Sequence, residues 1–421
     1  MMRAWEILEN KINRRLRKNR VLKAVLKRIY QGLMVFWVRP KRVEGLLQRV
    51  TPKDDWEYFF GYYDVCPWDA HDGKLLALRV RDARVMPTFE EAQIVLLPSG
   101  EEEKVRVLSS TRTWNTQQGC RLQWLGPDHE SRILYNDLVE GRYAAVILEL
   151  ASGHKWYLER PVMAVNPQGT EALSLDFSRL HRLRPGYGYG QLEEENEMEN
   201  CPDTPAIWWM DLMEGQVKPL FTYKELALFH HRQDMEGAVH KVNHLLVGPE
   251  GKRFMFLHRW IKDGRTTSRL LTAGMDGSGL YLLSDADMVS HCTWKSEKEV
   301  VGYMRRSPGT EGYFLLQDQT REARRIWPEL MVDGHPGFAL KGNLAVTDTY
   351  PGRTRQASVF LLEQDKATRI ARVYAPFAYE GTVRCDLHPR WNRQGTKICL
   401  DGAFEGRRAM YVLDVEDKVT L

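Results

Sequence analysis

The sequence predicts an all-β fold: a seven-bladed β-propeller of four-stranded blades, preceded by an N-terminal basic amphipathic α-helix. Two observations lead to this prediction. One unit of short apolar segments separated by polar turns recurs seven times across residues 61–421, at about 52 residues a unit. A four-stranded meander of this size cannot bury both of its faces alone, so neighbouring units must stack side by side around an axis.

The arm and the body of the chain differ in charge. Residues 1–50 hold 14 Lys and Arg against 3 Asp and Glu, a net charge of +11, and the whole chain carries +4, which leaves −7 for residues 51–421. We therefore divide the chain into a helical arm, 1–50, and a propeller, 51–421. The acidic body argues against nucleic acid as a partner, because phosphate binding needs a positive face.

Within the arm, the pattern predicts a helix over residues 3–35, where apolar side chains recur at helical spacing and no Gly or Pro precedes Gly32. A short apolar segment, 33–38, ends before Pro40. No apolar run approaches the roughly 20 residues that span a bilayer. A basic amphipathic helix of this kind can lie on an anionic membrane surface, or it can pack on the body or on another subunit.

The cysteines and the N-terminus indicate the compartment. None of the six cysteines forms a CxxC pair, which argues against a zinc ribbon, and their number is low for a disulfide scaffold. The N-terminus lacks an apolar core followed by a small-residue cleavage site, so no signal peptide is indicated. The expected location is the cytoplasm, either free or at the membrane periphery through the arm.

Third strands mark the seven blades most clearly. They are short apolar runs, each followed by a polar turn, at 94–97, 145–148, 207–210, 270–273, 313–316, 359–362 and 410–413. Fourth strands are expected at 105–108, 155–158, 217–221, 280–283, 324–327, 368–373 and 418–421. The pattern does not reveal how the ring closes, and residues 56–60 are a candidate to pair with the last blade.

Four consecutive blades begin their first strand with a histidine. His244, His335 and His388 each lie seven positions before a turn glycine. His291 is aligned with His388 because a Trp follows each of them three positions later. First strands line the channel of a propeller, so equivalent residues form a ring at one mouth. Imidazoles that converge there can bind a divalent metal. The alternative is a structural role in hydrogen bonds between blades.

Basic and aromatic residues are expected around this ring. The loops between second and third strands emerge on the same face and carry Arg182, Arg259, Trp260 and Tyr350, while Arg384 and Arg390 flank His388. Aromatic rings stack on sugar faces, and arginine forms forked hydrogen bonds with carboxylates. The combination therefore favours an anionic oligosaccharide or polysaccharide as the partner.

Several short motifs resemble the oligogalacturonate lyase family: Gly-Tyr-Tyr-Asp at 61–64, the segment 240–260, Ser-His-Cys-Thr-Trp at 290–294, Asp-Gly-His-Pro at 333–336 and Asp-Leu-His-Pro-Arg-Trp at 386–391. The segments Asn-Pro-Gln-Gly-Thr at 166–170 and Gly-Pro-Glu-Gly-Lys at 248–252 resemble the TolB-like propeller repeat. The resemblance implies a seven-bladed propeller, an architecture that ulvan lyases share. It also implies a divalent cation, often manganese, held by three histidines and a glutamine.

Carried over residue by residue, the resemblance assigns His291, His335 and His388 to the metal and places His244 facing the substrate. The family's glutamine has no match, because Val332 and Asp333 occupy the stretch before His335. The fourth ligand is therefore left open between His244, Asp333 and water. Manganese is the expected metal, with zinc and calcium as alternatives.

The resemblance and the residues together lead to the hypothesis of a metal-dependent lyase that cleaves a uronic-acid-containing glycan by β-elimination. The candidate bases are His244, Arg259 and Tyr350. The candidate substrate-binding residues are Arg182, Trp260, Arg384 and Arg390. The alternative is a non-catalytic, membrane-peripheral propeller that binds carbohydrate or serves as a scaffold in polysaccharide biosynthesis, so the sequence leaves open whether the protein is an enzyme.

Overall fold

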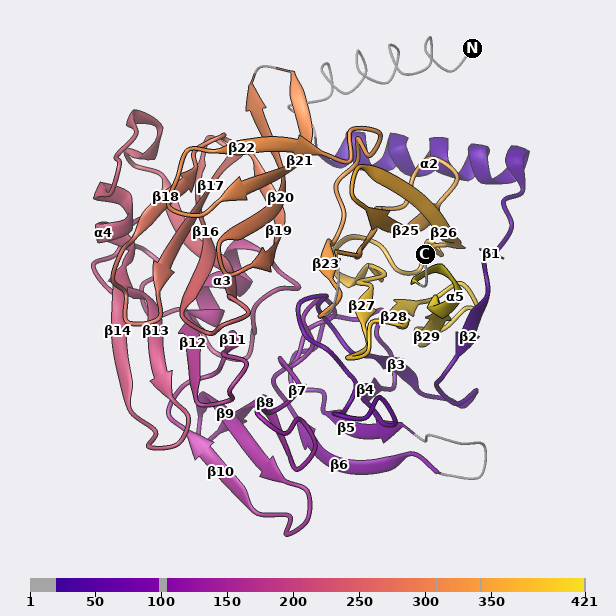
Figure 1. Ribbon diagram of the computed structural model, residues 1–421, viewed down its shortest axis with the longest axis horizontal. Helices are drawn as coiled ribbons and strands as arrows, with labels where there is room; N and C mark the ends of the chain where they lie inside the picture. The colour runs from indigo at the N-terminus through magenta and orange to yellow at the C-terminus, as the bar shows by residue number, and fades with distance from the viewer. Residues whose placement is uncertain (1–19, 98–103, 308, 341–342, 420–421) are drawn as a thin grey trace.

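The computed structural model describes residues 20–97, 104–307, 309–340 and 343–419. The strands of these residues form seven antiparallel sheets around a central axis, as Figure 1 shows. The predicted seven-bladed propeller is therefore confirmed. The first three blades are β3 (Glu57–Phe59), β4 (Leu75–Val80), β5 (Ala92–Leu97) and β6 (Arg106–Thr111); β7 (Gln123–Trp124), β8 (Arg132–Val139), β9 (Arg142–Glu149) and β10 (Lys155–Leu158); and β11 (Ala164–Val165), β12 (Glu171–Leu175), β13 (Pro205–Asp211) and β14 (Val217–Thr222).

The remaining four blades carry the aligned histidines in their first strands or two residues before them. They are β15 (Val239–Val247), β16 (Arg253–Lys262), β17 (Arg265–Gly274) and β18 (Tyr281–Ser284); β19 (Val289–Ser296), β20 (Glu299–Ser307), β21 (Thr310–Gln317) and β22 (Ala323–Ile326); β23 (Gly337–Phe338), β24 (Ala345–Asp348), β25 (Gln356–Glu363) and β26 (Lys366–Tyr374); and β27 (Arg390–Trp391), β28 (Lys397–Gly402) and β29 (Ala409–Asp414).

Third strands are the elements that the sequence identifies best, because all seven predicted ones fall within observed strands. In β9, the six residues 143–148 are buried consecutively. Each blade packs against a neighbour on both faces, so its inner strands are covered on both sides and read as continuous apolar runs. Leu257 of the fourth blade and Val300 of the fifth, for example, lie in one shared apolar cluster.

The ring closes with a strand from the beginning of the chain. β2 (Leu47–Arg49) pairs with β29, with Leu47 opposite Leu413, and supplies the fourth strand of the seventh blade. The fourth strand predicted at 418–421 is therefore wrong: Glu416–Val419 form the short helix α5, and residues 420–421 lie outside the described residues. The carboxylate of Asp414 accepts a hydrogen bond from the backbone N–H of Glu416 at 3.0 Å and so favours a helical turn over a strand.

Two further segments near residue 50 belong to the ring. β1 (Val43–Glu44) adds a fifth strand to the sixth blade through β26, so strands of the propeller begin before residue 51. Residues 56–60 contribute β3, which pairs with β4 in the first blade. This segment also contacts the seventh blade. Its hydrogen bonds there include one of 2.9 Å from the backbone of Tyr58 to the carbonyl of Arg408 and one of 3.3 Å from the N–H of Phe60 to the carboxylate of Asp401.

Helices occur outside the sheets. The arm forms α2 (Arg20–Val38), which runs three residues past the predicted end at residue 35 and includes the whole apolar segment 33–38; residues 3–19 of the predicted helix lie outside the described residues. The helices α3 (Phe177–Leu183), α4 (Tyr223–Leu228), η2 (Gln233–Met235) and η3 (Gly381–Val383) lie in loops between second and third strands or between blades. None of the helices in the described ranges combines the length and apolarity of a membrane span.

Candidate functional site

The four aligned histidines form one cluster. His244 lies in β15 and His291 in β19, while His335 and His388 lie two residues before β23 and β27. The ring centroids of His291 and His335 are 4.3 Å apart, and so are those of His335 and His388; the centroid of His244 is 6.2 Å from that of His291. All four side chains are buried.

Three of these histidines have their Nδ1 atoms fixed by oxygen acceptors. Nδ1 of His291 donates to the carboxylate of Asp333 at 3.1 Å, and Nδ1 of His335 donates to that of Asp348 at 2.7 Å. Nδ1 of His388 donates to the carbonyl of Gly61 at 2.7 Å. Histidines that bind metals show this arrangement, because the second hydrogen bond fixes the ring and leaves Nε2 for the metal.

The donor atoms of this cluster fit a divalent metal. Nε2 of His335 and Nε2 of His388 are buried and have no hydrogen-bond partner within the described part of the chain. A carboxylate oxygen of Asp386 joins them, and the ligand atoms of these three residues lie within 4.8 Å of one another. Two imidazoles and a carboxylate suit manganese or zinc. Asp386 is thus a candidate ligand that the sequence reasoning missed.

The electrostatics of the cluster differ between its members. Burial lowers the pKa of His291, of His388 and of His244, so these rings are neutral, as metal ligands must be. Burial also lowers the pKa of His335, but the carboxylate of Asp348 outweighs it and raises this pKa to about 9. A metal at Nε2 of His335 would therefore displace a proton.

The backbone around His335 explains its position. A Cβ atom on Gly334 would lie 1.8 Å from the carbonyl oxygen of Asp348, so only glycine fits between Asp333 and His335. This close approach lets the Asp348 carboxylate accept from the backbone N–H groups of His335 at 2.8 Å and His388 at 3.1 Å. One carboxylate at the end of β24 therefore holds histidines from two blades together.

His244 differs from the other three because both of its ring nitrogens have protein partners. Nδ1 lies 3.3 Å from the hydroxyl of Tyr62, and Nε2 lies 3.1 Å from the hydroxyl of Tyr63 and 3.0 Å from the carbonyl of Cys292. The rings of Tyr62 and Tyr63 lie in the centre of the cluster, and that of Tyr63 has centroid distances of 5.2–6.3 Å to all four histidines. These contacts occupy the groups that a base or a fourth ligand would use.

A cavity of about 120 Å³ adjoins the histidines. All three candidate bases, His244, Arg259 and Tyr350, line it, and so does the predicted metal ligand His291. The other lining residues are Tyr62, Arg184, Tyr187, Asn243, Ser290 and Asp333. Burial raises the pKa of the Asp333 carboxyl, but His291, Ser290 and His335 together lower it by more. The pKa therefore lies below its ordinary value, and the group remains an anion.

Two arginines, Arg184 and Arg259, line the cavity, and Arg384 lies beside it. Arg184 and Arg384 both donate to the hydroxyl oxygen of Tyr187, at 3.2 Å and 2.7 Å. Burial, reinforced by Arg184, lowers the pKa of Arg259 to about 10. The Nε atoms of Arg184 and Arg259 and Oδ1 of Asn243 are buried without a hydrogen-bond partner among the residues that the structure describes. The two guanidinium nitrogens can donate to a ligand in the cavity, and the amide oxygen of Asn243 can accept from one.

The remaining predicted site residues have structural partners. Arg182 pairs with Glu194 in the loop that carries α3. Trp260 is buried with Met235 and Ala238, and Arg390 donates to Asp401 at 2.8 Å. None of the three is among the residues that line the cavity, and Trp260 and Arg390 are buried, so substrate binding by these residues stays a prediction.

Arg384 lies at the edge of the site, with its guanidinium 5.6 Å from the centroid of the Tyr350 ring and its Nε donating to Asp386 at 2.7 Å. One missed residue, Asp386, had a signal in the sequence. Asp386 precedes His388 by two positions, just as Asp333, a predicted candidate ligand, precedes His335. This repeated Asp-x-His spacing marks both carboxylates, whereas Tyr187 lies in an insertion where no repeat could indicate it.

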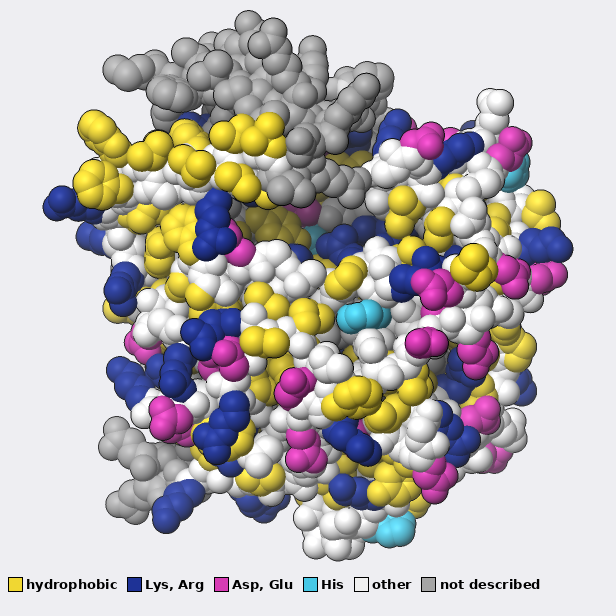
Figure 2. Space-filling model, turned by 180° about the vertical axis from the view of Figure 1, so that it is seen from behind, with side chains coloured by type: hydrophobic (Ala, Val, Ile, Leu, Met, Phe, Trp, Pro, Cys, Tyr) yellow, Lys and Arg dark blue, Asp and Glu magenta, His cyan; other side chains and the backbone are white. Residues whose placement is uncertain are grey.

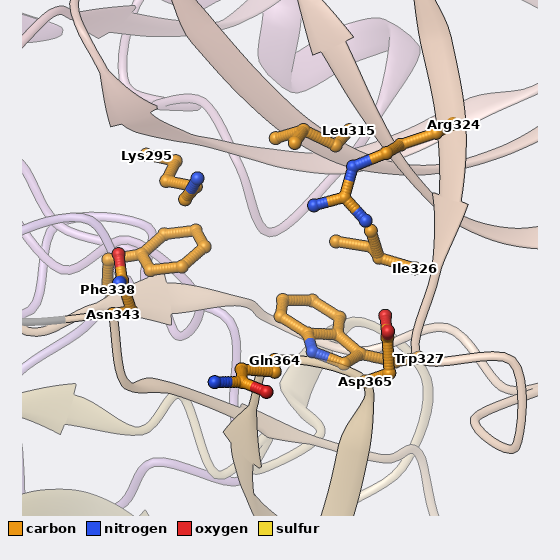
Figure 3. A pocket seen from close by; sticks show the side chains of 9 residues that line it. All are labelled: Lys295, Leu315, Arg324, Ile326, Trp327, Phe338, Asn343, Gln364 and Asp365. Atoms are coloured by element: carbon orange, nitrogen blue, oxygen red, sulfur yellow. The ribbon is translucent and has the colours of Figure 1, made fainter.

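A second cavity, of about 170 Å³, lies between the fifth and sixth blades (Figure 3). Trp327 and Phe338 form its apolar wall, and Lys295, Arg324 and Asp365 supply charges. Turns between first and second strands and between third and fourth strands border it, so it belongs to the opposite end of the blades from the histidine cluster. No histidine is among the described residues that line it.

Comparison with known proteins gives a likeness of fold. No protein-family model and no curated protein sequence matches the chain. Among solved structures, an oligogalacturonate lyase in complex with manganese superposes with a TM-score of 0.64 at 16% identity, covering 89% of this chain and 94% of that one. An oligogalacturonate lyase from Vibrio parahaemolyticus has a TM-score of 0.62 at 13% identity, covering 89% and 97%.

Peptidase propellers are less similar. Prolyl oligopeptidase B from Galerina marginata has a TM-score of 0.50 at 10% identity, and the match covers 93% of this chain but 53% of that one. The lyase structures instead match over nearly their whole length. The resemblance that the sequence motifs indicated is therefore confirmed at the level of the fold.

Proposed function

We propose that the protein is a metal-dependent, lyase-like enzyme that cleaves a uronic-acid-containing oligosaccharide or polysaccharide by β-elimination. The observation that carries the proposal is the group of three imidazoles with Nδ1 atoms held by oxygen acceptors, next to a cavity lined by arginine. The likeness of fold to a manganese complex of an oligogalacturonate lyase supports it.

The metal would be held by His291, His335 and His388, with Asp386 as the additional protein ligand. Manganese is our first choice, and zinc and calcium are the alternatives. When bound, it would supply a Lewis acid that polarises the carboxylate of the uronate. The free Nε2 atoms of His335 and His388 support this assignment.

Arginines would bind the substrate carboxylate. Arg184 lines the cavity, and its Nε atom has no partner in the described ranges, so it can donate to a carboxylate oxygen. Arg384 supports Arg184 through their shared acceptor, the hydroxyl oxygen of Tyr187. Neutralising the carboxylate makes the adjacent C5 proton more acidic, because it stabilises the enolate-like state that forms when this proton leaves.

Arg259 is the base that fits best among the three candidates. Arg259 lines the cavity, and its lowered pKa of about 10 increases the fraction of the neutral guanidine that can accept a proton. His244 is held at both nitrogens. In the reaction, Arg259 takes the C5 proton, the C5–H electron pair forms the C4–C5 double bond, and the bond from C4 to the glycosidic oxygen breaks.

Tyr350 would protonate the departing oxygen. It lines the same cavity, and burial raises its pKa well above the ordinary value, so it keeps its proton at neutral pH. The products are a sugar with a new reducing end and an unsaturated uronate, whose conjugated double bond absorbs in the ultraviolet.

This absorbance tests the proposal. Metal-loaded protein is incubated with polymers and oligomers of galacturonate, glucuronate, mannuronate and guluronate, and we expect the absorbance to rise on at least one of them. Arg259→Gln should lower kcat by about 10²-fold or more, because a positioned base contributes about that factor. The matched control is Arg265→Gln, an exposed arginine of the neighbouring strand β17, which should leave the rate unchanged.

Absence of an absorbance rise on every substrate, with metal bound, would remove the lyase proposal. Binding of a uronate oligomer without any product, measured by calorimetry, would favour the non-catalytic carbohydrate-binding alternative instead.

A further inference from the structure

The helix α2 presents an apolar face to solvent. Its large apolar side chains Val25, Leu26, Ile29, Leu33, Phe36 and Trp37 are 41–81% exposed. At about 100° per residue these six positions fall within about 120° of the helix circumference. Figure 2 shows hydrophobic side chains gathered along this helix, at the upper left. Exposed apolar patches of this kind mark interaction sites.

The opposite side of α2 holds it on the propeller. Gln31 is 3% exposed, and its side-chain amide donates to the carbonyl of Gly352 at 2.9 Å. Arg28 pairs with Glu380 at 3.6 Å and lies over the ring of Phe377. By the same helical spacing, Gln31 lies about 180° from the centre of the apolar face. The apolar face is therefore not the surface by which the helix packs on the body.

We propose that this face, the outer face of α2, docks on an anionic lipid bilayer. The sequence of α2 contains four Lys and Arg and no Asp or Glu, and residues 1–50 together carry +11. Phe36 and Trp37 are the most exposed of the apolar side chains, at 70% and 81%. A helix with aromatic and aliphatic groups on one face and basic groups beside them lies in the plane of a negatively charged membrane surface.

Docking in this way would hold the candidate site close to the membrane. Gly352, which accepts from Gln31, lies two residues after Tyr350, and Glu380, which pairs with Arg28, lies four residues before Arg384. The helix is therefore fixed to the loop that carries Tyr350 of the cavity and to the segment that carries Arg384 at its edge. This inference stands independently of the proposed chemistry, because it uses none of the residues of the cavity.

Vesicle flotation with the full chain tests the proposal. The protein is mixed with vesicles of phosphatidylcholine alone or of phosphatidylcholine with phosphatidylglycerol. We expect it to float with the anionic vesicles, and to float less as salt rises, because salt screens the attraction. Phe36→Ser combined with Trp37→Ser should lower the affinity at least about tenfold, since both changes remove apolar area that the bilayer would bury.

The matched control makes the same chemical change elsewhere. Met198→Ser combined with Leu228→Ser alters two apolar side chains that are 94% and 67% exposed outside α2, and it should leave flotation unchanged. Because all four side chains are exposed, both variants should remain folded, which circular dichroism checks. The proposal is overturned if the protein stays unbound with anionic vesicles or if the Phe36/Trp37 variant floats as well as the wild type. It is also overturned if sedimentation shows, without vesicles, a dimer that this variant abolishes, because a second copy then covers the face.

Discussion

Single buried carboxylates organise the charged residues at the centre of the ring. Asp401 is fully buried and accepts from Arg390 at 2.8 Å and Arg408 at 3.1 Å. The carboxylate of Asp348 likewise accepts from two blades, through the backbone N–H groups of His335 and His388. Removing one partner of such a group leaves a buried charge uncompensated, at a cost of about 3–5 kcal/mol. The positions of the basic and imidazole groups therefore depend on a few acidic residues.

Lys241 makes stability depend on pH. Its ammonium is buried on β15, donates to the carbonyl of Leu183 at 3.1 Å, and has a pKa that burial, together with Arg259, lowers from 10.5 to about 6. Between these values the unfolded chain binds more protons than the folded one, so the free energy of unfolding rises with pH. We expect Lys241→Met to be more stable than the wild type near neutral pH, with an advantage that shrinks towards about pH 10.

Urea unfolding of both proteins at several pH values between about 6 and 10 measures this difference. A difference that stays constant over the whole range would show that the amine of Lys241 is not desolvated in the folded protein.

The short strands β1 and β2 hold the ring together by pairing with strands from the end of the chain. β2 completes the seventh blade and β1 extends the sixth, so both cover strand edges that would otherwise expose unpaired backbone groups. Arg49 at the end of β2 also pairs with Glu405 at 2.7 Å. The seam of the propeller is therefore formed by hydrogen bonds between the two ends of the described chain.

Two truncations separate the roles of α2 and of these strands. A chain that begins at residue 40 keeps β1 and β2, and one that begins at residue 51 lacks both. We expect the longer chain to remain stably folded and the shorter one to lose about 3 kcal/mol or more of unfolding free energy, because the ladder hydrogen bonds of β2 and the apolar contacts of Leu47 are lost with the deleted residues. Urea denaturation measures both, and equal midpoints would contradict a role of β2 in closure.

The candidate site depends on the whole molecule, because its parts come from several blades. His291, His335 and His388 belong to the fifth, sixth and seventh blades, and Gly61, which holds His388, belongs to the loop after β3 in the first. The proposed metal would therefore join three consecutive blades, and the first blade would support one of its ligands. A metal that binds the folded ring and not the unfolded chain increases the free energy of unfolding.

Thermal unfolding with and without manganese tests this linkage. At about 100 times its dissociation constant the metal should stabilise the wild type by about 2.7 kcal/mol, seen as a higher Tm. The double variant His335→Ala/His388→Ala should show no such rise. The exposed pair His71→Ala/His154→Ala, on the first and second blades, is the matched control and should respond like the wild type. A Tm that manganese raises equally in all three proteins would place the metal elsewhere.

The sequence by itself determined the seven repeats and the equivalent positions of four histidines, because the spacing of apolar strands and polar turns is a local property of the chain. Only the tertiary structure decided which strand closes the ring, which face of α2 is exposed and which histidine nitrogens are already bonded. These features depend on contacts between distant residues, such as His388 and Gly61, which are 327 positions apart. No local pattern encodes such a contact, because it exists only once the blades have closed into a ring.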